Sequence, residues 1–229
     1  DSHEVAGGRR APGGREGGDA DRVEAMLEAA DRGDVGAMES FLKTDPGLLD
    51  RAGQDPHWES ESVTPLHVAA RAGKADAVRF LLDRGANPEA RDGHMQRTPL
   101  LFAAMRGRRE AMELLASRGA RVDIHAAAAM GDADRVRAFL DADPALAGDR
   151  GPEGATPLHY ASTPEVARLL LDRGADPAAT DEHRRRTALS WTARRPEVGR
   201  VIAERMGVDD IYTACAFGDA DRAAALVGA

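Results

Sequence analysis

The sequence predicts an all-α solenoid of stacked helix-turn-helix units, and three observations support that prediction. A short motif returns along the chain, each copy is followed by a second apolar segment that ends at glycine, and the 229 residues include 45 alanines but only nine aromatic residues. A compact domain of this length would pack large side chains at one centre. Many small interfaces between closely spaced helices suit an alanine-rich chain better than one deep core.

The repeated motif marks the first helix of each unit. T-P-L-H-V-A-A at 64–70 returns as T-P-L-L-F-A-A at 98–104, as T-P-L-H-Y-A at 156–161, and more loosely as T-A-L-S-W at 187–191. Threonine can cap a helix start, and proline is tolerated in the first turn. The motif therefore predicts first helices that start near residues 64, 98, 156 and 187.

A second motif follows each copy and marks the second helix. V-R-F-L-L-D-R-G-A-N-P at 78–88 is matched by V-A-R-L-L-L-D-R-G-A-D-P at 166–177. Glycine stands where each second helix must end, which predicts positive φ at Gly85, Gly119, Gly174 and Gly207. With both motifs in register, the chain resembles the ankyrin repeat family of bacterial type, whose unit is a β-turn finger and two antiparallel helices with a T-P-L-H-x-A signature.

Other units keep the helix pair but have no room for a finger. A-A-D-R-G-D at 29–34, A-A-A-M-G-D at 127–132 and A-C-A-F-G-D at 214–219 share small residues followed by Gly-Asp. Their first helices are expected near residues 21, 124 and 211, which gives an array over 21–229 of six repeats and a partial seventh. The repeats form three-repeat blocks at 21–120 and 121–208, and a third block opens at 209.

The two ends of the chain fall outside the regular blocks. Residues 1–20 are rich in glycine and arginine without a helical apolar period, which predicts a flexible tail. The partial seventh repeat stops at Ala229 before its expected Asp-Pro turn. Either the natural chain continues beyond Ala229, or the last residues form a reduced terminal cap.

Composition and motif searches narrow the class of function. The net charge of -8 and a sequence pI near 5.4 make nucleic acid an unlikely partner. No stretch has the length and apolarity of a membrane span, so we expect a cytoplasmic monomer. The single cysteine, Cys215, excludes a multi-thiolate zinc site and matches the buried positions of Ala30 and Ala128. Without a metal-binding or phosphate-binding motif, we expect no metal, no cofactor and no enzymatic activity.

Two sets of ring-bearing residues recur at fixed positions in the repeat. The resemblance implies that the repeated histidine hydrogen-bonds locally and ties neighbouring turns together. These histidines are His67, His125 and His159. The second set is aromatic and shares another position of the first helix: Phe102, Tyr160 and Trp191. We expect these rings to pack between the layers of the stack. An alternative is that the polar tips of Tyr160 and Trp191 reach a partner.

The fingers are the expected place of function. Residues 92–98 and 181–187 share a D-x-H-x-x-R-T frame around different tips, and residues 54–62 form a longer finger with a tryptophan among acidic residues. The resemblance implies a non-enzymatic module that binds a protein or peptide on its concave finger and first-helix surface, and its arginines suit acidic segments. The expected contact residues are Trp58, Glu59, Ser60, Glu61, Arg71, His94, Met95, Met105, Arg106, Glu153, His183, Arg184, Arg185 and Arg194.

The missing finger at 120–123 suggests a second hypothesis. Its absence should leave a notch between two pairs of fingers that could admit a small ligand or host chemistry at the one titratable group there, His125. The residues expected around this notch are Met105, His125, Ala129, Met130 and Thr163.

Overall fold

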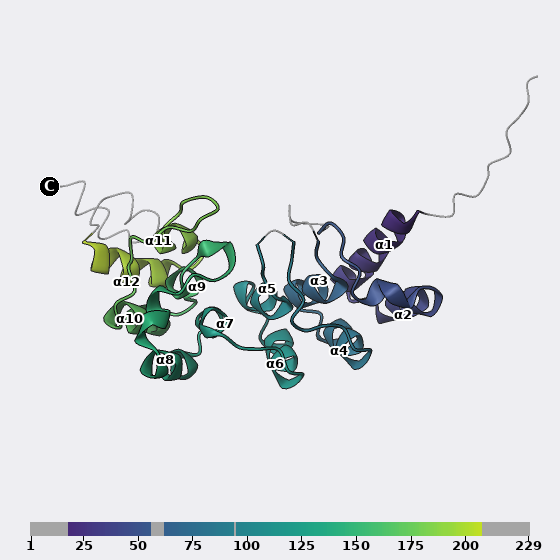
Figure 1. Ribbon diagram of the computed structural model, residues 1–229, viewed down its shortest axis with the longest axis horizontal. Helices are drawn as coiled ribbons and strands as arrows, with labels where there is room; N and C mark the ends of the chain where they lie inside the picture. The colour runs from purple at the N-terminus through teal and green to yellow at the C-terminus, as the bar shows by residue number, and fades with distance from the viewer. Residues whose placement is uncertain (1–17, 56–61, 94, 208–229) are drawn as a thin grey trace, which may run out of the picture.

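The computed structural model describes residues 18–55, 62–93 and 95–207, and it confirms the all-α solenoid (Figure 1). The expected tail lies almost wholly outside these residues, as do the partial seventh repeat and Cys215. The elements are α1 (Asp19–Arg32), α2 (Val35–Thr44), η1 (Pro46–Leu49), α3 (Pro65–Ala72), α4 (Ala75–Asp83), α5 (Pro99–Met105), α6 (Arg109–Ser117), α7 (Ile124–Met130), α8 (Ala133–Ala142), η2 (Pro144–Gly148), η3 (Pro152–Gly154), α9 (Pro157–Tyr160), α10 (Pro164–Asp172), α11 (Ala188–Trp191) and α12 (Pro196–Met206).

The helices stack in two layers. Each first helix packs on the first helix of the next repeat, in the order α1, α3, α5, α7, α9 and α11. Figure 1 shows the second helices α4, α6 and α8 along the opposite edge from the loops that precede α3, α5 and α11. Paired alanines line the first-helix layer and are at most 4% exposed, at Ala69, Ala70, Ala103, Ala104, Ala127 and Ala128. The alanine excess therefore serves close helix approach, as the sequence predicts.

The helix ends follow the predicted capping chemistry. Thr64 and Thr156 cap α3 and α9, each with proline as the first helical residue. All four glycines expected at the ends of second helices have positive φ, between 65° and 94°. Helix α1 begins at Asp19, two residues before the position expected near residue 21. Among the described residues, β structure is limited to two isolated bridges, Gly53 with Val63 and Thr180 with Thr187.

The first helices of the two fingered repeats are about one turn shorter in the second block than in the first. Helices α9 and α11 have four residues each, whereas α3 has eight and α5 has seven. Arg195 replaces part of the missing turn, because its Nη1 donates to the carbonyl oxygens of Tyr160 (3.1 Å) and Ala161 (2.7 Å). Burial lowers the pKa of the Arg195 guanidinium. The sequence motifs did not predict this shortening.

The repeats separate on one side where the finger is missing. Helices α5 and α7 pack together at this junction, but α6 and α8 scarcely touch, whereas α4 packs on α6 and α8 packs on α10. Ala116, Val122 and Phe139 line a shallow hollow of about 520 Å³ between α6 and α8. The junction of the two blocks is thus held mainly through the first-helix layer and the finger side.

Candidate partner-binding surface

A buried Asp-Arg pair shapes the finger at residues 92–97. The Asp92 carboxylate accepts hydrogen bonds from the backbone N–H of Arg97 (2.7 Å) and from its Nε (2.9 Å) and Nη2 (2.8 Å). Both residues are at most 5% exposed. Both guanidinium donors bind Oδ2 and the backbone donor binds Oδ1, and a buried, charge-assisted pair with three hydrogen bonds fixes the geometry between Asp92 and Arg97. The D-x-H-x-x-R-T frame is therefore a scaffold for the finger.

The repeated histidine ties that finger to the helix beside it. His67 Nε2 lies 3.1 Å from the carbonyl oxygen of Arg97, and Nδ1 lies 3.2 Å from the backbone nitrogen of Thr64. A carbonyl can only accept, so Nε2 donates and Nδ1 accepts from Thr64. Burial lowers the pKa of His67 to about 4, which keeps the ring neutral at physiological pH. The expected structural role of this histidine is confirmed.

The finger at residues 181–186 uses the same chemistry in a more open setting. Asp181 Oδ1 accepts from the backbone N–H of Arg184 (2.7 Å), and Oδ2 accepts from Trp191 Nε1 (2.8 Å). Burial alone would raise the pKa of Asp181, but the hydrogen bonds from Arg184, Trp191 and Arg186 outweigh it and lower that pKa. The Arg186 side chain is 41% exposed, unlike that of Arg97. His159 binds the Arg186 carbonyl at 3.1 Å, and burial lowers its pKa.

The aromatic residues pack between layers, as predicted. Each repeated histidine meets the aromatic ring of the next repeat edge-on, with centroid distances of 5.2 Å to Phe102, 5.8 Å to Tyr160 and 5.4 Å to Trp191. The Tyr160 hydroxyl donates to the Pro152 carbonyl at 2.8 Å, and the Trp191 indole donates to Asp181. Both polar tips thus bind within the chain, which does not support the alternative that they reach a partner.

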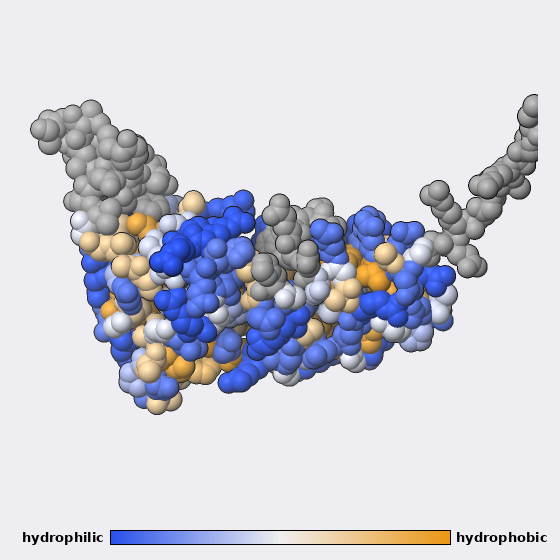
Figure 2. All heavy atoms as spheres, turned by 45° about the horizontal axis from the view of Figure 1, so that its top comes forward, coloured by the Kyte–Doolittle hydropathy of each residue, from blue (hydrophilic) through white to orange (hydrophobic). Residues whose placement is uncertain are grey.

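Five of the expected contact residues lie outside the described part of the chain: Trp58, Glu59, Ser60, Glu61 and His94. Seven others are exposed or partly exposed at fingertips and helix ends: Met95, Met105, Arg106, His183, Arg184, Arg185 and Arg194. Figure 2 brings the finger side of Figure 1 forward and shows a mainly hydrophilic surface with scattered apolar patches. The described fingertip surface is thus polar and rich in cations.

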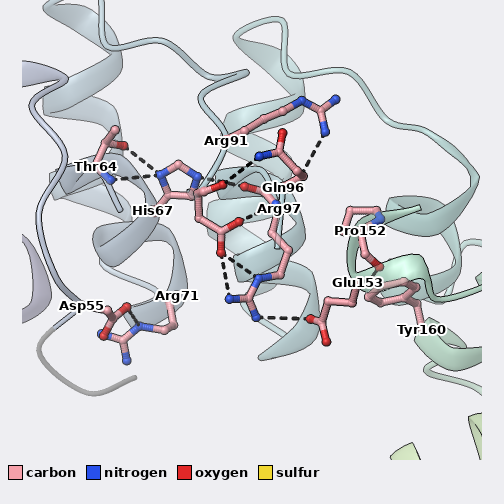
Figure 3. A network of polar contacts seen from close by, with 11 residues as sticks. Asp55, Thr64, His67, Arg71, Arg91, Gln96, Arg97, Pro152, Glu153 and Tyr160 are labelled. Carbon is pink, nitrogen blue, oxygen red and sulfur yellow. Dashed lines mark hydrogen bonds and ion pairs between the residues drawn. The ribbon is translucent and has the colours of Figure 1, made fainter. Parts of the chain in front are cut away.

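The remaining two expected contact residues, Arg71 and Glu153, are buried instead. The Arg71 side chain is 8% exposed and pairs with Asp31 (2.8 Å) and Asp55 (3.3 Å). The Glu153 side chain is 6% exposed and pairs with Arg97 at 3.4 Å (Figure 3). These side chains hold repeats together rather than face solvent, so we remove both from the expected contact set.

Arginines from different repeats come close to one another at the helix ends. Partial desolvation lowers the pKa of Arg106, the charges of Arg71, Arg194 and Arg108 lower it further, and the charge of Asp55 opposes the shift. Arg108 is anchored by a hydrogen bond from Nε to the Arg71 carbonyl at 3.2 Å. The side chains of Arg106, Arg108 and Arg194 are exposed. We call the exposed residues Arg106, Arg108 and Arg194 the arginine cluster; Arg71 lies beside it, buried and paired with Asp31 and Asp55.

A hollow of about 670 Å³ occupies the place of the missing finger. Of the five residues expected around the notch, only His125 lines it, and its Nε2 is bound to the Asp149 carbonyl at 3.2 Å. The other four do not line the hollow: Met105, Ala129, Met130 and Thr163. The walls come instead from the finger residues before the gap and from residues 149–154 after it. These two segments are far apart in the sequence and meet only in the folded chain. The motif spacing therefore did not predict that they line the hollow.

Several residues that shape the surface were not singled out from the sequence. Asp92 and Arg97 appeared only as the ends of a frame, although their spacing was visible. For Arg195 the available signal was the three-residue shortening between Thr156 and Gly174 relative to Thr64 and Gly85. Over the described ranges, no group of His, Cys, Asp and Glu could hold a metal ion, and no helix is long and apolar enough to cross a membrane.

Comparison with known proteins gives partial matches to longer chains. XBAT31 of Arabidopsis thaliana, named as an E3 ubiquitin-protein ligase, is 35% identical over 62% of this chain and 35% of its own length. The human ankyrin repeat and SOCS box protein 16 is 32% identical over 69% of this chain and 29% of its own. The chain thus spans about a third of the length of these relatives. They are plant and human proteins, and neither a bacterial origin nor a cytoplasmic location follows from them.

Further matches come from a solved structure and from family models. A chain from the complex of a predatory endopeptidase of Bdellovibrio bacteriovorus with an immunity protein matches with a TM-score of 0.48 and 24% identity, covering 79% of this chain and 97% of that chain. A family model of three ankyrin repeats matches residues 26–125, and the ankyrin repeat model matches residues 153–182. The chain belongs to the ankyrin repeat family.

Proposed function

We propose that this chain is a non-enzymatic module that binds a protein or peptide partner on its fingertips and first-helix ends, as a monomer and without a cofactor. Ankyrin repeats are in general protein–protein interaction modules. The observation that carries the proposal for this chain is the arginine cluster, in which exposed guanidinium groups crowd beside rigid, buried scaffolding.

The chemistry of the cluster favours an acidic partner segment. Arginine presents a planar fork that pairs with carboxylates through two hydrogen bonds. A carboxylate placed between Arg106 and Arg194 would relieve the repulsion that lowers the pKa of Arg106. The alternative of ligand chemistry at His125 has less support, because Nε2 of that ring already donates to a backbone carbonyl.

Site-specific crosslinking tests the location of the surface. A photo-crosslinking amino acid at Met95 or Met105 should give partner adducts in a lysate of the source organism, and one at Ala138, exposed on α8, should give few. The pair Arg106→Glu and Arg194→Glu should reduce the adducts at least tenfold. Arg168→Glu, an exposed arginine on α10, is the matched control for charge. Adducts from Ala138 alone, or equal losses from both sets of variants, would contradict the proposal.

A further inference from the structure

The hollow at the missing finger differs from the other finger junctions. Residues 150–154 and 180–186 stand side by side, joined by the backbone hydrogen bond from Glu182 N–H to the Glu153 carbonyl (3.0 Å). The contact is close, because a Cβ built on Gly154 would lie 2.3 Å from Glu182 Cγ. At the 120–123 junction a hollow of about 670 Å³ takes the place of such a neighbour.

One contact crosses this gap at its base. Arg97, at the end of one finger, pairs with Glu153 from the other side at 3.4 Å, and Figure 3 shows Arg91 and Gln96 facing Pro152 across the space. Glu153 has φ of 64°, a costly conformation for a residue with a side chain. The Arg97–Glu153 pair therefore joins the two walls of the hollow at its base, and the hollow above this pair stays open.

Carboxylates outnumber arginines in the lining of the hollow, which favours a cation: Asp123, Asp149, Glu153 and Glu182 against Arg91 and Arg150. Asp123, Asp149 and Glu182 are exposed carboxylates at its edge. The two arginines in the lining already donate to backbone carbonyls: Arg91 to Gln96 (2.9 Å), and Arg150 to Gly154 (2.7 Å) and Thr180. Asp123 Oδ1 caps α7 by accepting from the Ala126 N–H (2.8 Å), and the other oxygens of the three exposed carboxylates can accept hydrogen bonds from an added donor.

The apolar part of the lining suits a long side chain. Met95 belongs to the finger on one wall and Pro152 to the segment on the other. Lysine and arginine bury an aliphatic stem against such groups while the charged end stays with polar partners. At other junctions the side of a finger faces the neighbouring finger. At this junction the same sides can bind an extended peptide backbone, which supplies both hydrogen-bond donors and acceptors.

We propose that this hollow, which we call the vacant-finger slot, seats an extended basic segment of a partner polypeptide, with one arginine or lysine stem between Met95 and Pro152 and its charged end among Asp123, Asp149 and Glu182. The segment takes the place of the finger that this junction lacks. The slot is separate from the arginine cluster and has the opposite charge preference; it rests on the proposed function only in taking the ligand to be a polypeptide.

Titration of the full chain with a defined probe tests the slot. The probe is the capped peptide Gly-Ser-Arg-Lys-Arg-Ser-Gly, with Gly-Ser-Glu-Glu-Glu-Ser-Gly as its acidic twin, followed by NMR shifts of the Gly151 and Gly154 amides. The pair Asp149→Asn and Glu182→Gln should weaken probe binding at least tenfold. The matched pair Glu113→Gln and Asp134→Asn, exposed on second helices, should change it less than twofold.

A variant that closes the slot gives a second, independent arm. A copy of residues 89–97 inserted between Arg121 and Val122 should restore a finger and abolish probe binding, with helicity retained by circular dichroism. No saturable shift at 1 mM probe, equal weakening by the two pairs, or equal binding of the acidic twin would overturn the proposal. Arg106→Glu with Arg194→Glu should leave probe binding intact, so failure of the slot and failure of the arginine surface are distinguishable.

Discussion

The two three-repeat blocks share one order of units but stabilise their fingers and helix ends differently. In the first block the finger arginine, Arg97, is buried with Asp92, and the first helices of the fingered repeats, α3 and α5, have eight and seven residues. In the second block the equivalent Arg186 is 41% exposed, and the first helices of the fingered repeats, α9 and α11, stop after one turn. The same repeat motif thus forms a buried Asp–Arg ion pair in the first block and a partly exposed Asp–Arg pair in the second. We therefore expect substitutions in the two pairs to lower the stability of the fold by unequal amounts.

The largest expected difference between the blocks follows loss of the finger aspartate. Asp92→Asn removes the carboxylate charge that faces the buried Arg97 guanidinium, and should destabilise by about 3 to 5 kcal/mol. Asp181→Asn should cost roughly 1 kcal/mol, since water can reach Arg186. Urea unfolding of both variants measures the difference in the free energy of unfolding. Equal losses would mean that burial of the arginine is not what separates the fingers.

Acid should weaken the first block through His67. Its pKa is about 4 in the folded chain against 6.5 in the unfolded chain, so the unfolded state binds the proton more readily between these values. Stability is therefore full above pH 6.5 and is lost as the pH falls toward 4, by about 3 kcal/mol in total. His159 contributes in the same direction.

The test of this prediction uses a pH range in which few carboxylates change their protonation state. Urea midpoints between pH 7 and 5 should fall for the parent chain and fall less for His67→Asn, whatever the absolute stability of that variant. His183→Asn, exposed at a fingertip, is the matched control and should keep the parent slope. An identical slope in His67→Asn would remove His67 as the cause.

The end of the shortened helix α9 depends on one arginine. Arg195→Ala removes the donor for the Tyr160 and Ala161 carbonyls where α9 stops, and should destabilise by about 2 kcal/mol. Lys74 occupies the corresponding N-cap position of α4 but is exposed, so Lys74→Ala should change stability by less than about 0.5 kcal/mol. Thermal unfolding compares the two. If Arg195→Ala and Lys74→Ala lower the stability by similarly small amounts, the short helix α9 does not need Arg195.

Local motifs predicted the parts of this fold that depend on local chemistry. The threonine caps, the glycine helix ends and the histidine ties follow from residues within one or two repeats, and the structure contains them. The buried state of Arg71 and Glu153 could not be predicted in this way. Their partners, Asp31 and Arg97, lie 40 and 56 residues away in the sequence, and only the stacking of repeats sets those distances.

The one-turn first helices show a different limit. A threonine-proline start looks the same whether the helix runs one turn or two, because the cap acts on the first turn alone. The difference lies at the other end, where in α9 Arg195 donates to the carbonyls of Tyr160 and Ala161. The hollow at the missing finger was predicted at the right junction, but four of its five expected lining residues were wrong, since the walls come from loops whose direction the helix motif does not specify.

The smallest expected effect concerns the ion pair that joins the two blocks. Burial raises the pKa of Glu153, although Arg97 opposes the shift. A raised pKa means that the folded state favours the neutral acid, so this carboxyl contributes stability below pH 4.5 that is lost as the pH rises through the folded pKa. Glu153→Gln should therefore alter stability at pH 7 by no more than about 1 kcal/mol, toward neutral or greater stability, while Asp92 retains Arg97. Urea unfolding at pH 5 and 7 should show that the variant gains relative to the parent chain at the higher pH; a loss of several kcal/mol there would instead show that the charged pair itself holds the blocks together.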